Sequence, residues 1–319
     1  MKNNLGPLDS QDGTIELSVI VPTYNEGGHI AETLRWIESG ITPWCQAFEI
    51  LVVDDGSTDN TWSELQTARR GSARICALRF SRNFGKEASL RAGLEAASGR
   101  AVVVMDADRQ HPVELIREMM GIWRSGQADV VEAVKASRGR ESWLHKTTAR
   151  LFYFMMRQLT GFDLNNASDF KLLDRTVRDA YLELKERTLF FRGMAHWVGF
   201  RRKQVSFEVA PRAAGDSKWN FRALVALAET AVISSSIFPL RAIYVLALVY
   251  LIAGGVVGGI AVVQYLGGVA LTGFTTVILL IILSSASMLI ALAVIGQYLG
   301  RIYREVQGRP SFLISDRLN

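Results

Sequence analysis

Short aliphatic runs alternate with segments of helical spacing in the first third of the chain. The runs cover Leu17 to Thr23, Glu49 to Val53 and Ala101 to Met105, and each ends at a cluster of polar residues. Apolar residues recur at helical spacing over roughly 28–39, 60–70 and 86–97. A short aliphatic run between polar residues is typical of a buried strand in a parallel sheet. The alternation predicts a doubly wound α/β sheet whose strand ends form one pocket.

Two carboxylates, Asp106 and Asp108, directly follow the third run. Parallel sheets bind ligands at the carboxyl ends of their strands. Residues two positions apart in an extended segment point the same way, so both acids can bind one hard divalent cation together with a substrate phosphate. The alternative is an acidic strand-to-helix turn in which Asp108 caps the following helix.

The C-terminal part of the chain contains a long uncharged stretch. Residues 242–300 include no Asp, Glu, Lys or Arg. Segments 242–266 and 274–299 each exceed the roughly 20 residues that cross about 30 Å of hydrocarbon, with 267–273 as the turn. The pattern predicts a hairpin of two transmembrane helices. A pair of buried core helices is the alternative, although such helices normally keep a polar stripe.

Basic residues around this hairpin predict its orientation. Arg241 precedes the first helix, and Arg301, Arg304 and Arg309 follow the second, whereas the turn has no basic residue. The positive-inside rule then places both ends and the catalytic region in the cytoplasm, as expected for a multi-pass protein of the inner membrane. Residues 1–14 are polar and lack an apolar core, which predicts a disordered tail and no signal peptide.

The segment 218–240 has few charges and suits a helix lying in the membrane interface, or one packed against the globular domain. The formal net charge of +5 favours an anionic leaflet or lipid head group. No aromatic-basic stacking motif accompanies it, so we do not expect nucleic-acid binding. Cys45 and Cys76 are predicted to be packing residues of a protein in a reducing compartment, without a disulfide.

Several motifs occur together in a characteristic order. They are Pro22-Thr23-Tyr24-Asn25-Glu26, Asp54-Asp55-Gly56-Ser57-Thr58-Asp59, Asp106-Ala107-Asp108-Arg109-Gln110-His111-Pro112, Asp169-Phe170-x-x-x-Asp174-Arg175, Arg192-Gly193 and Arg212-x-x-Gly215-x-Ser217-Lys218. The first three resemble family-2 inverting glycosyltransferases of the GT-A (Rossmann-like) fold. The others resemble the polyprenyl-phosphate branch, which contains dolichol-phosphate mannose synthases and bactoprenol glucosyltransferases. The resemblance covers about residues 16 to 310.

This resemblance implies a donor site and a metal site. The positions that match donor-nucleoside contacts are Pro22, Tyr24, Glu26, Asp54 and Asp55. Those that match ligands of Mg²⁺ or Mn²⁺ are Asp106, Asp108 and Gln110. Residues 54–57 also fit a turn in which Ser57 or Asp59 caps the following helix, and His111 fits a turn residue better than a metal ligand.

The resemblance also implies an acceptor site. Asp169 matches the acid proposed as the base or as the residue that orients the acceptor, but it also fits a helix cap. Basic residues that match the acceptor-phosphate site form a loop after a strand that ends near Ala133, and a second pair nearer the membrane: Lys135, Arg138, Arg140 with Ser142, then Arg212 and Lys218. Charge-assisted bonds to phosphate suit them, although a solvated basic loop is the usual alternative.

The resemblance implies a membrane-anchored inverting enzyme that moves a sugar from a nucleotide sugar to a polyprenyl phosphate on the cytoplasmic leaflet. UDP-glucose and undecaprenyl phosphate are the expected substrates. A processive polysaccharide synthase is disfavoured because no Gln-x-x-Arg-Trp occurs, and a non-catalytic sensor of nucleotide sugars is the other alternative. We expect a tail at 1–14, a GT-A catalytic domain at 15–217, a juxtamembrane segment at 218–240, the hairpin at 241–300 and a cytoplasmic tail at 301–319. Relatives imply a homo-oligomer, specifically a tetramer.

Overall fold

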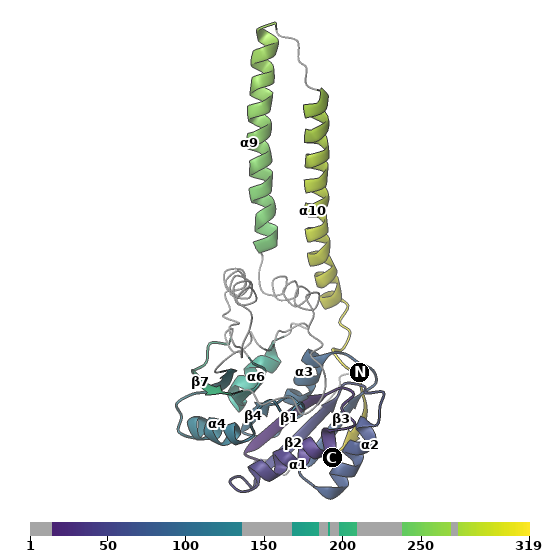
Figure 1. Ribbon diagram of the computed structural model, residues 1–319, viewed down its shortest axis with the longest axis vertical. Coiled ribbons are helices and arrows are strands. Elements are labelled where there is room, and N and C mark those ends of the chain that lie inside the picture. Colours follow the sequence, from purple (N-terminus) through teal and green to yellow (C-terminus); the bar gives the residue numbers. More distant parts are fainter. Residues whose placement is uncertain (1–14, 136–167, 185–190, 192–197, 209–237, 269–273) are drawn as a thin grey trace. The chain divides into compact units, whose positions relative to one another are not determined.

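The computed structural model describes residues 15–135, 168–184, 191, 198–208, 238–268 and 274–319 (Figure 1). The chain divides into two compact units. One comprises Met1–Asn220 together with Pro310–Asn319, and the other comprises Phe221–Arg309. The stretch 301–319, expected as a tail, is therefore divided between the two units.

The first unit is built on one eight-stranded sheet with the strand order β7-β5-β6-β4-β1-β2-β3-β8. The strands are β1 (Leu17–Thr23), β2 (Phe48–Asp54), β3 (Ile75–Phe80), β4 (Ala101–Val104), β5 (Val130–Lys135), β6 (Lys171–Asp174), β7 (Arg202–Phe207) and β8 (Ile314–Leu318). Strands β3, β2, β1 and β4 are mutually parallel, whereas β6 and β8 run antiparallel to their neighbours. The predicted α/β sheet is confirmed, with antiparallel strands added on both sides of its parallel centre.

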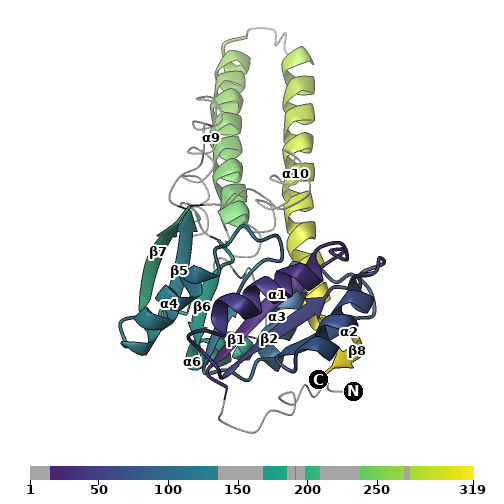
Figure 2. The same cartoon turned by 60° about the horizontal axis from the view of Figure 1, so that its bottom comes forward.

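Helices cover both faces of this sheet (Figure 2). Helices α1 (Ile30–Ile41), α2 (Thr61–Gly71) and α4 (Glu114–Arg124) share one apolar cluster with the sheet, and α3 (Lys86–Ala96) and α6 (Arg175–Glu183) share another. Successive strand residues point to opposite faces, so Val19 and Val21 join the first cluster while Ile20 joins the second. Burial on both faces explains why these strands are mostly aliphatic and do not alternate regularly with polar residues.

The strand order reverses between β1 and β4. From β1 the chain proceeds through β2 to β3 on one side, and then returns to place β4 on the other side of β1. Open α/β sheets bind ligands outside the carboxyl ends of the strands at such a switch point. The loops after β1 and β4 therefore border the expected binding crevice.

The second unit contains two long helices, α9 (Phe238–Leu266) and α10 (Phe274–Val306). Pro239–Leu266 and Leu280–Val306 are long and apolar enough to cross a membrane, and the most apolar window of each has none of its residues buried within the structure. The Tyr250 hydroxyl of α9 donates a hydrogen bond to the Leu283 carbonyl of α10 at 2.9 Å. Two helices at the expected positions agree with the predicted hairpin.

Both cysteines behave as predicted. Cys45 is buried in the apolar core between α1 and β2, and Cys76 lies on β3. Neither forms a disulfide, and burial raises the pKa of both thiols. They are packing residues.

Candidate active site

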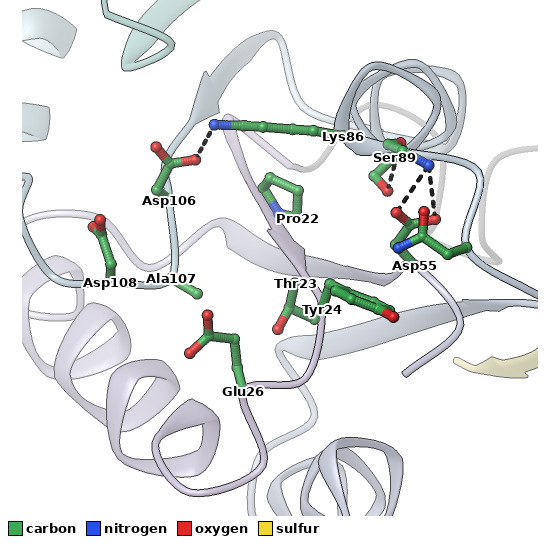
Figure 3. A pocket seen from close by; sticks show the side chains of 12 residues that line it. Pro22, Thr23, Tyr24, Glu26, Asp55, Lys86, Ser89, Asp106, Ala107 and Asp108 are labelled. Carbon is green, nitrogen blue, oxygen red and sulfur yellow. Dashed lines mark hydrogen bonds and ion pairs between the residues drawn. The ribbon is translucent and has the colours of Figure 1, made fainter. Parts of the chain in front are cut away.

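A cavity of about 370 Å³ lies at the carboxyl ends of β1, β2, β3 and β4 (Figure 3). The residues that line it come from the end of β1, from the loops after these four strands and from the start of α3: Pro22, Thr23, Tyr24, Glu26, Asp55, Asn83, Gly85, Lys86, Ser89, Asp106, Ala107 and Asp108. Six of the predicted site residues are among them, although they are separated by up to 86 positions in the sequence. They meet because parallel strands end at the same edge of the sheet.

Hydrogen bonds hold the loop after β1 against the loop after β2. The Asn25 side chain accepts a bond from the Thr58 backbone N–H at 2.9 Å, and the Asn25 N–H donates to Ser57 Oγ at 2.9 Å. Asn25 has a φ of 54°, which a non-glycine residue rarely adopts. While these hydrogen bonds hold the two loops together, Tyr24 lies on the cavity wall and is 44% exposed. Its ring can stack there on a planar base.

Asp55 is buried and holds the loop that leads into α3. Its carboxylate accepts hydrogen bonds from the Phe84 N–H at 2.7 Å and the Gly85 N–H at 2.9 Å. Burial raises the pKa of Asp55, and these backbone bonds oppose the rise. Asp55 thus lines the cavity and also holds in place the loop that contains Phe84 and Gly85.

Asp54 has a different environment from its neighbour. It is fully buried and is not among the residues that line the cavity. Its Oδ1 accepts a bond from the Ser57 N–H at 2.9 Å, and its Oδ2 lies 3.5 Å from Arg79 Nε. A turn at residues 54–57 is therefore present, as in the sequence alternative, but the N-cap position of α2 belongs to Asn60 and not to Ser57 or Asp59.

Lys86 joins two of the predicted acids. Its Nζ lies 2.5 Å from Asp106 Oδ1 and 2.8 Å from Asp169 Oδ2. Burial lowers the pKa of Lys86, but the two carboxylates outweigh this cost and hold the pKa above its ordinary value. Lys86 was not predicted as a site residue. It is the first residue of α3, after the loop that follows β3, and no local pattern in the sequence distinguishes it from an ordinary lysine at a helix start.

Asp108 and Arg109 shape the turn after β4. Asp108 Oδ1 accepts a bond from the Gln110 N–H at 3.1 Å, while α4 begins at Glu114 with no side-chain cap. The alternative of Asp108 as a cap of α4 is therefore not found. Arg109 has a φ of 57°, and its side chain donates hydrogen bonds to Thr33 Oγ1 at 3.0 Å and to Glu32 Oε1 at 2.9 Å. Non-glycine residues at such angles concentrate at functional sites.

Asp169 lies just before β6 and is 6% exposed. It does not cap a helix, because the cap of α6 is Asp174, which accepts a bond from the Thr176 N–H at 2.8 Å. The structure instead brings Asp169 to Lys86. Asp169, the first acid of the motif, is not among the residues that line the cavity and contacts it through Lys86, whereas Asp174, the last acid, stabilises a helix.

His111 and Gln110 are not among the residues that line the cavity. The His111 ring is buried and stacks on Phe170 with centroids 4.8 Å apart, and it meets the edge of Phe207 at 5.7 Å. This packing agrees with a turn histidine, the alternative to a metal ligand.

Asp106 and Asp108 offer oxygen ligands to a cation. Within the described ranges, no group of three or more His, Cys, Asp and Glu side chains gathers in a way that could hold a metal ion. Mg²⁺ and Mn²⁺ need no such cage, because Mg²⁺ is commonly bound by one or two carboxylates together with waters and substrate phosphates. The two carboxylates fit a cation that is shared with a diphosphate.

Most of the residues predicted to bind the acceptor phosphate belong to segments that the structure does not describe. Arg138, Arg140, Ser142, Arg212 and Lys218 lie outside the described residues. The fifth strand continues two positions beyond Ala133, so Lys135 is its last residue and pairs with Phe207 of β7.

Comparisons with known proteins agree with the motifs. The family model described as glycosyl transferase family 2 matches residues 18–182. The chain is 38% identical over 305 residues to an uncharacterized glycosyltransferase of Synechocystis sp., covering 95% of this chain and 96% of that protein. It is 34% identical over 305 residues to the bactoprenol glucosyl transferase of Shigella phage SfII, covering 94% and 97%. A solved glucosyl-3-phosphoglycerate synthase from Mycobacterium tuberculosis matches at 20% identity and a TM-score of 0.47, over 69% of this chain and 78% of that one.

Proposed function

Because the chain belongs to glycosyl transferase family 2, we propose that this glycosyltransferase moves a sugar from a nucleoside diphosphate to a polyprenyl phosphate. The observation that carries the proposal is the acidic cavity at the strand switch point, in which Asp106 and Asp108 face Tyr24, Glu26 and Lys86. The acceptor class is supported by the relatives named as bactoprenol glucosyl transferases, which match nearly the whole chain.

The donor half of the cavity suits a nucleoside diphosphate. Glu26 and Asp55 can accept hydrogen bonds from ribose hydroxyls or a base N–H, and Tyr24 can stack on the base. Asp106 and Asp108 would hold Mg²⁺ or Mn²⁺, which stabilises the charge that develops on the leaving diphosphate. We propose UDP-glucose as the sugar donor.

The acceptor side contains Asp169 and the Lys86 ammonium. A phosphate monoester is largely dianionic near neutral pH, since its second pKa is about 6. It needs little help from a base, and the carboxylates around the site would repel it. Lys86, placed between Asp106 and Asp169, offsets this repulsion. Asp169 orients the acceptor phosphate for its attack on the sugar. We propose direct displacement with inversion at the sugar.

The two apolar helices supply the membrane link that a polyprenyl acceptor requires. Their length and composition suit a bilayer. The basic residues at the two ends of the hairpin that lie away from its turn favour a cytoplasmic catalytic unit. The proposed acceptor is undecaprenyl phosphate, with its head group presented at the cytoplasmic leaflet.

The test is a panel of radiolabelled nucleotide sugars added to membranes that contain the protein and undecaprenyl phosphate. We expect label from UDP-glucose to enter the organic phase with the wild type and with Glu114→Gln, an exposed acid outside the cavity. Asp106→Asn should transfer no label while remaining in the membrane. Label in an insoluble polymer would indicate a processive synthase. Binding of nucleotide sugar without transfer of any label would indicate a sensor.

A further inference from the structure

The chain that follows α10 returns to the first unit and adds β8 to the edge of its sheet. Strand β8 runs antiparallel to β3, with Leu318 opposite Ala77 and Asp316 opposite Arg79. The Ser81 N–H also donates to the Leu313 carbonyl at 2.9 Å. A strand here covers the backbone groups that an edge would otherwise expose.

An aromatic contact extends this pairing beyond the backbone. Phe312 is 4% exposed, and its ring stacks on Phe80 with centroids 5.0 Å apart and planes 11° apart. Phe80 in turn meets the edge of Phe84 at 5.7 Å. With Val53 and Ala92, these rings form a small apolar cluster that joins the ends of β2 and β3 to α3.

Phe80 of this cluster immediately precedes, in the sequence, a loop of the candidate active site. The loop, residues 81–85, contributes Asn83 and Gly85 to the cavity and is followed at once by Lys86. Its backbone N–H groups at Phe84 and Gly85 are the donors to Asp55. The Phe84 ring therefore packs against the Phe312 cluster, while the Phe84 backbone N–H bonds to Asp55 on the cavity wall.

The same loop fits tightly against the loop after β2. A Cβ atom added to Gly56, whose φ is 68°, would lie 2.4 Å from the Arg82 carbonyl carbon. Because the backbones approach this closely, a small displacement of residues 81–85 must change the cavity. Cover of the sheet edge alone would not require a buried aromatic ring at this place.

We propose that Phe312 and β8 position the 81–85 loop for donor binding, so that the segment leaving the second apolar helix is part of the nucleotide site. Phe312 is a positioning residue, acting through Phe80 and Phe84. Only residues 307–313 separate α10 from β8, so one continuous segment serves the apolar helix and the donor cavity. The inference rests on the proposed function, because it takes the cavity to be the donor site.

Steady-state kinetics of Phe312→Ala test the proposal. We expect the KM for the donor to rise about tenfold, equivalent to about 1.4 kcal/mol, with kcat little changed, because binding common to the ground and transition states is lost. Phe312→Leu, which keeps an apolar side chain, should recover most of the affinity. Arg117→Ala, at an exposed position of α4, should match the wild type.

Hydrogen exchange of the wild-type protein gives a second test that needs no variant. Coupling between two sites is reciprocal, so UDP with Mg²⁺ should slow exchange in residues 81–85 and also in residues 314–318. Unchanged exchange in 314–318 when UDP binds, or a wild-type KM in a folded Phe312→Ala, would overturn the inference and leave β8 as a cover for the edge. Failure of the wild type to bind any nucleotide would instead refute the proposed function.

Discussion

Replacing Lys86 with methionine tests the part of the site that the sequence did not reveal. Methionine keeps most of the side-chain length and removes the ammonium. The change leaves Asp106 and Asp169 without the cation that now lies 2.5 Å and 2.8 Å from their oxygens. We expect transfer to fall strongly, because incoming phosphates would meet acids whose charge is no longer offset.

The two contacts differ in strength because their exposure differs. The Asp106 side chain is 29% exposed and that of Lys86 is 41% exposed, so solvent screening limits this contact to about 1 kcal/mol. The Asp169 side chain is 6% exposed, and a hydrogen bond between charged groups at such a site contributes about 1.5 to 2 kcal/mol. If the ammonium makes equivalent interactions with substrate phosphates, its loss costs about 2.5 to 3 kcal/mol, or about 70- to 160-fold in kcat/KM.

The assay measures transfer of label from the donor to the lipid, with kcat and KM separated, in protein whose thermal unfolding is followed in parallel. Lys86→Arg keeps the charge and should retain more activity than Lys86→Met. Lys203→Met removes an exposed lysine of β7 and serves as the matched control. The reasoning is refuted if folded Lys86→Met keeps kcat/KM within about threefold of the wild type, a loss below about 0.7 kcal/mol.

Three other substitutions test the environment of the cavity. Burial raises the pKa of Asp54, so Asp54→Asn should keep or raise the thermal midpoint at pH 7 and leave donor KM nearly unchanged; a loss of UDP binding would favour direct donor contact. The pKa of Asp174 is lowered, since hydrogen bonds from Thr176 and a tryptophan outweigh burial. Asp174→Ala should therefore cost about 1 to 2 kcal/mol in unfolding free energy at pH 7. That difference should shrink as the pH falls from about 3.9 through the lower folded value, and a constant difference down to pH 2 would contradict this. Gly56→Ala should weaken UDP binding in calorimetry because its Cβ would lie 2.4 Å from the Arg82 backbone, and wild-type affinity would show that the loops can separate harmlessly.

Local patterns were sufficient where a structure depends on neighbouring residues. The run at Leu17–Thr23 is β1 to the residue, because a strand buried on both faces is mostly aliphatic instead of alternating with polar residues. The uncharged stretch likewise predicted two apolar helices, since a lipid-facing helix tolerates few charges. The meeting of Tyr24, Asp55 and Asp106 was also predictable, because parallel strands end at one edge of the sheet.

Other features depend on contacts between distant parts of the chain. Lys86 meets partners 20 and 83 positions away, and no local pattern distinguishes it from an ordinary lysine at a helix start. Asp54 and Asp55 are adjacent in sequence, yet only the packed loops show that Asp55 lines the cavity and Asp54 does not.

The segment 314–318 illustrates the same division most clearly. Its residues Ile-Ser-Asp-Arg-Leu carry too weak a pattern to predict a strand, so the sequence by itself predicts only a tail here. The strand forms because the edge of β3 offers backbone partners and the Phe80 cluster buries Phe312. By itself, the sequence determined the parallel centre of the sheet, the apolar helices and the acids at the strand ends. Tertiary packing alone decided how Lys86 pairs and where β8 lies, because the free energy of those contacts comes from residues far apart in the chain.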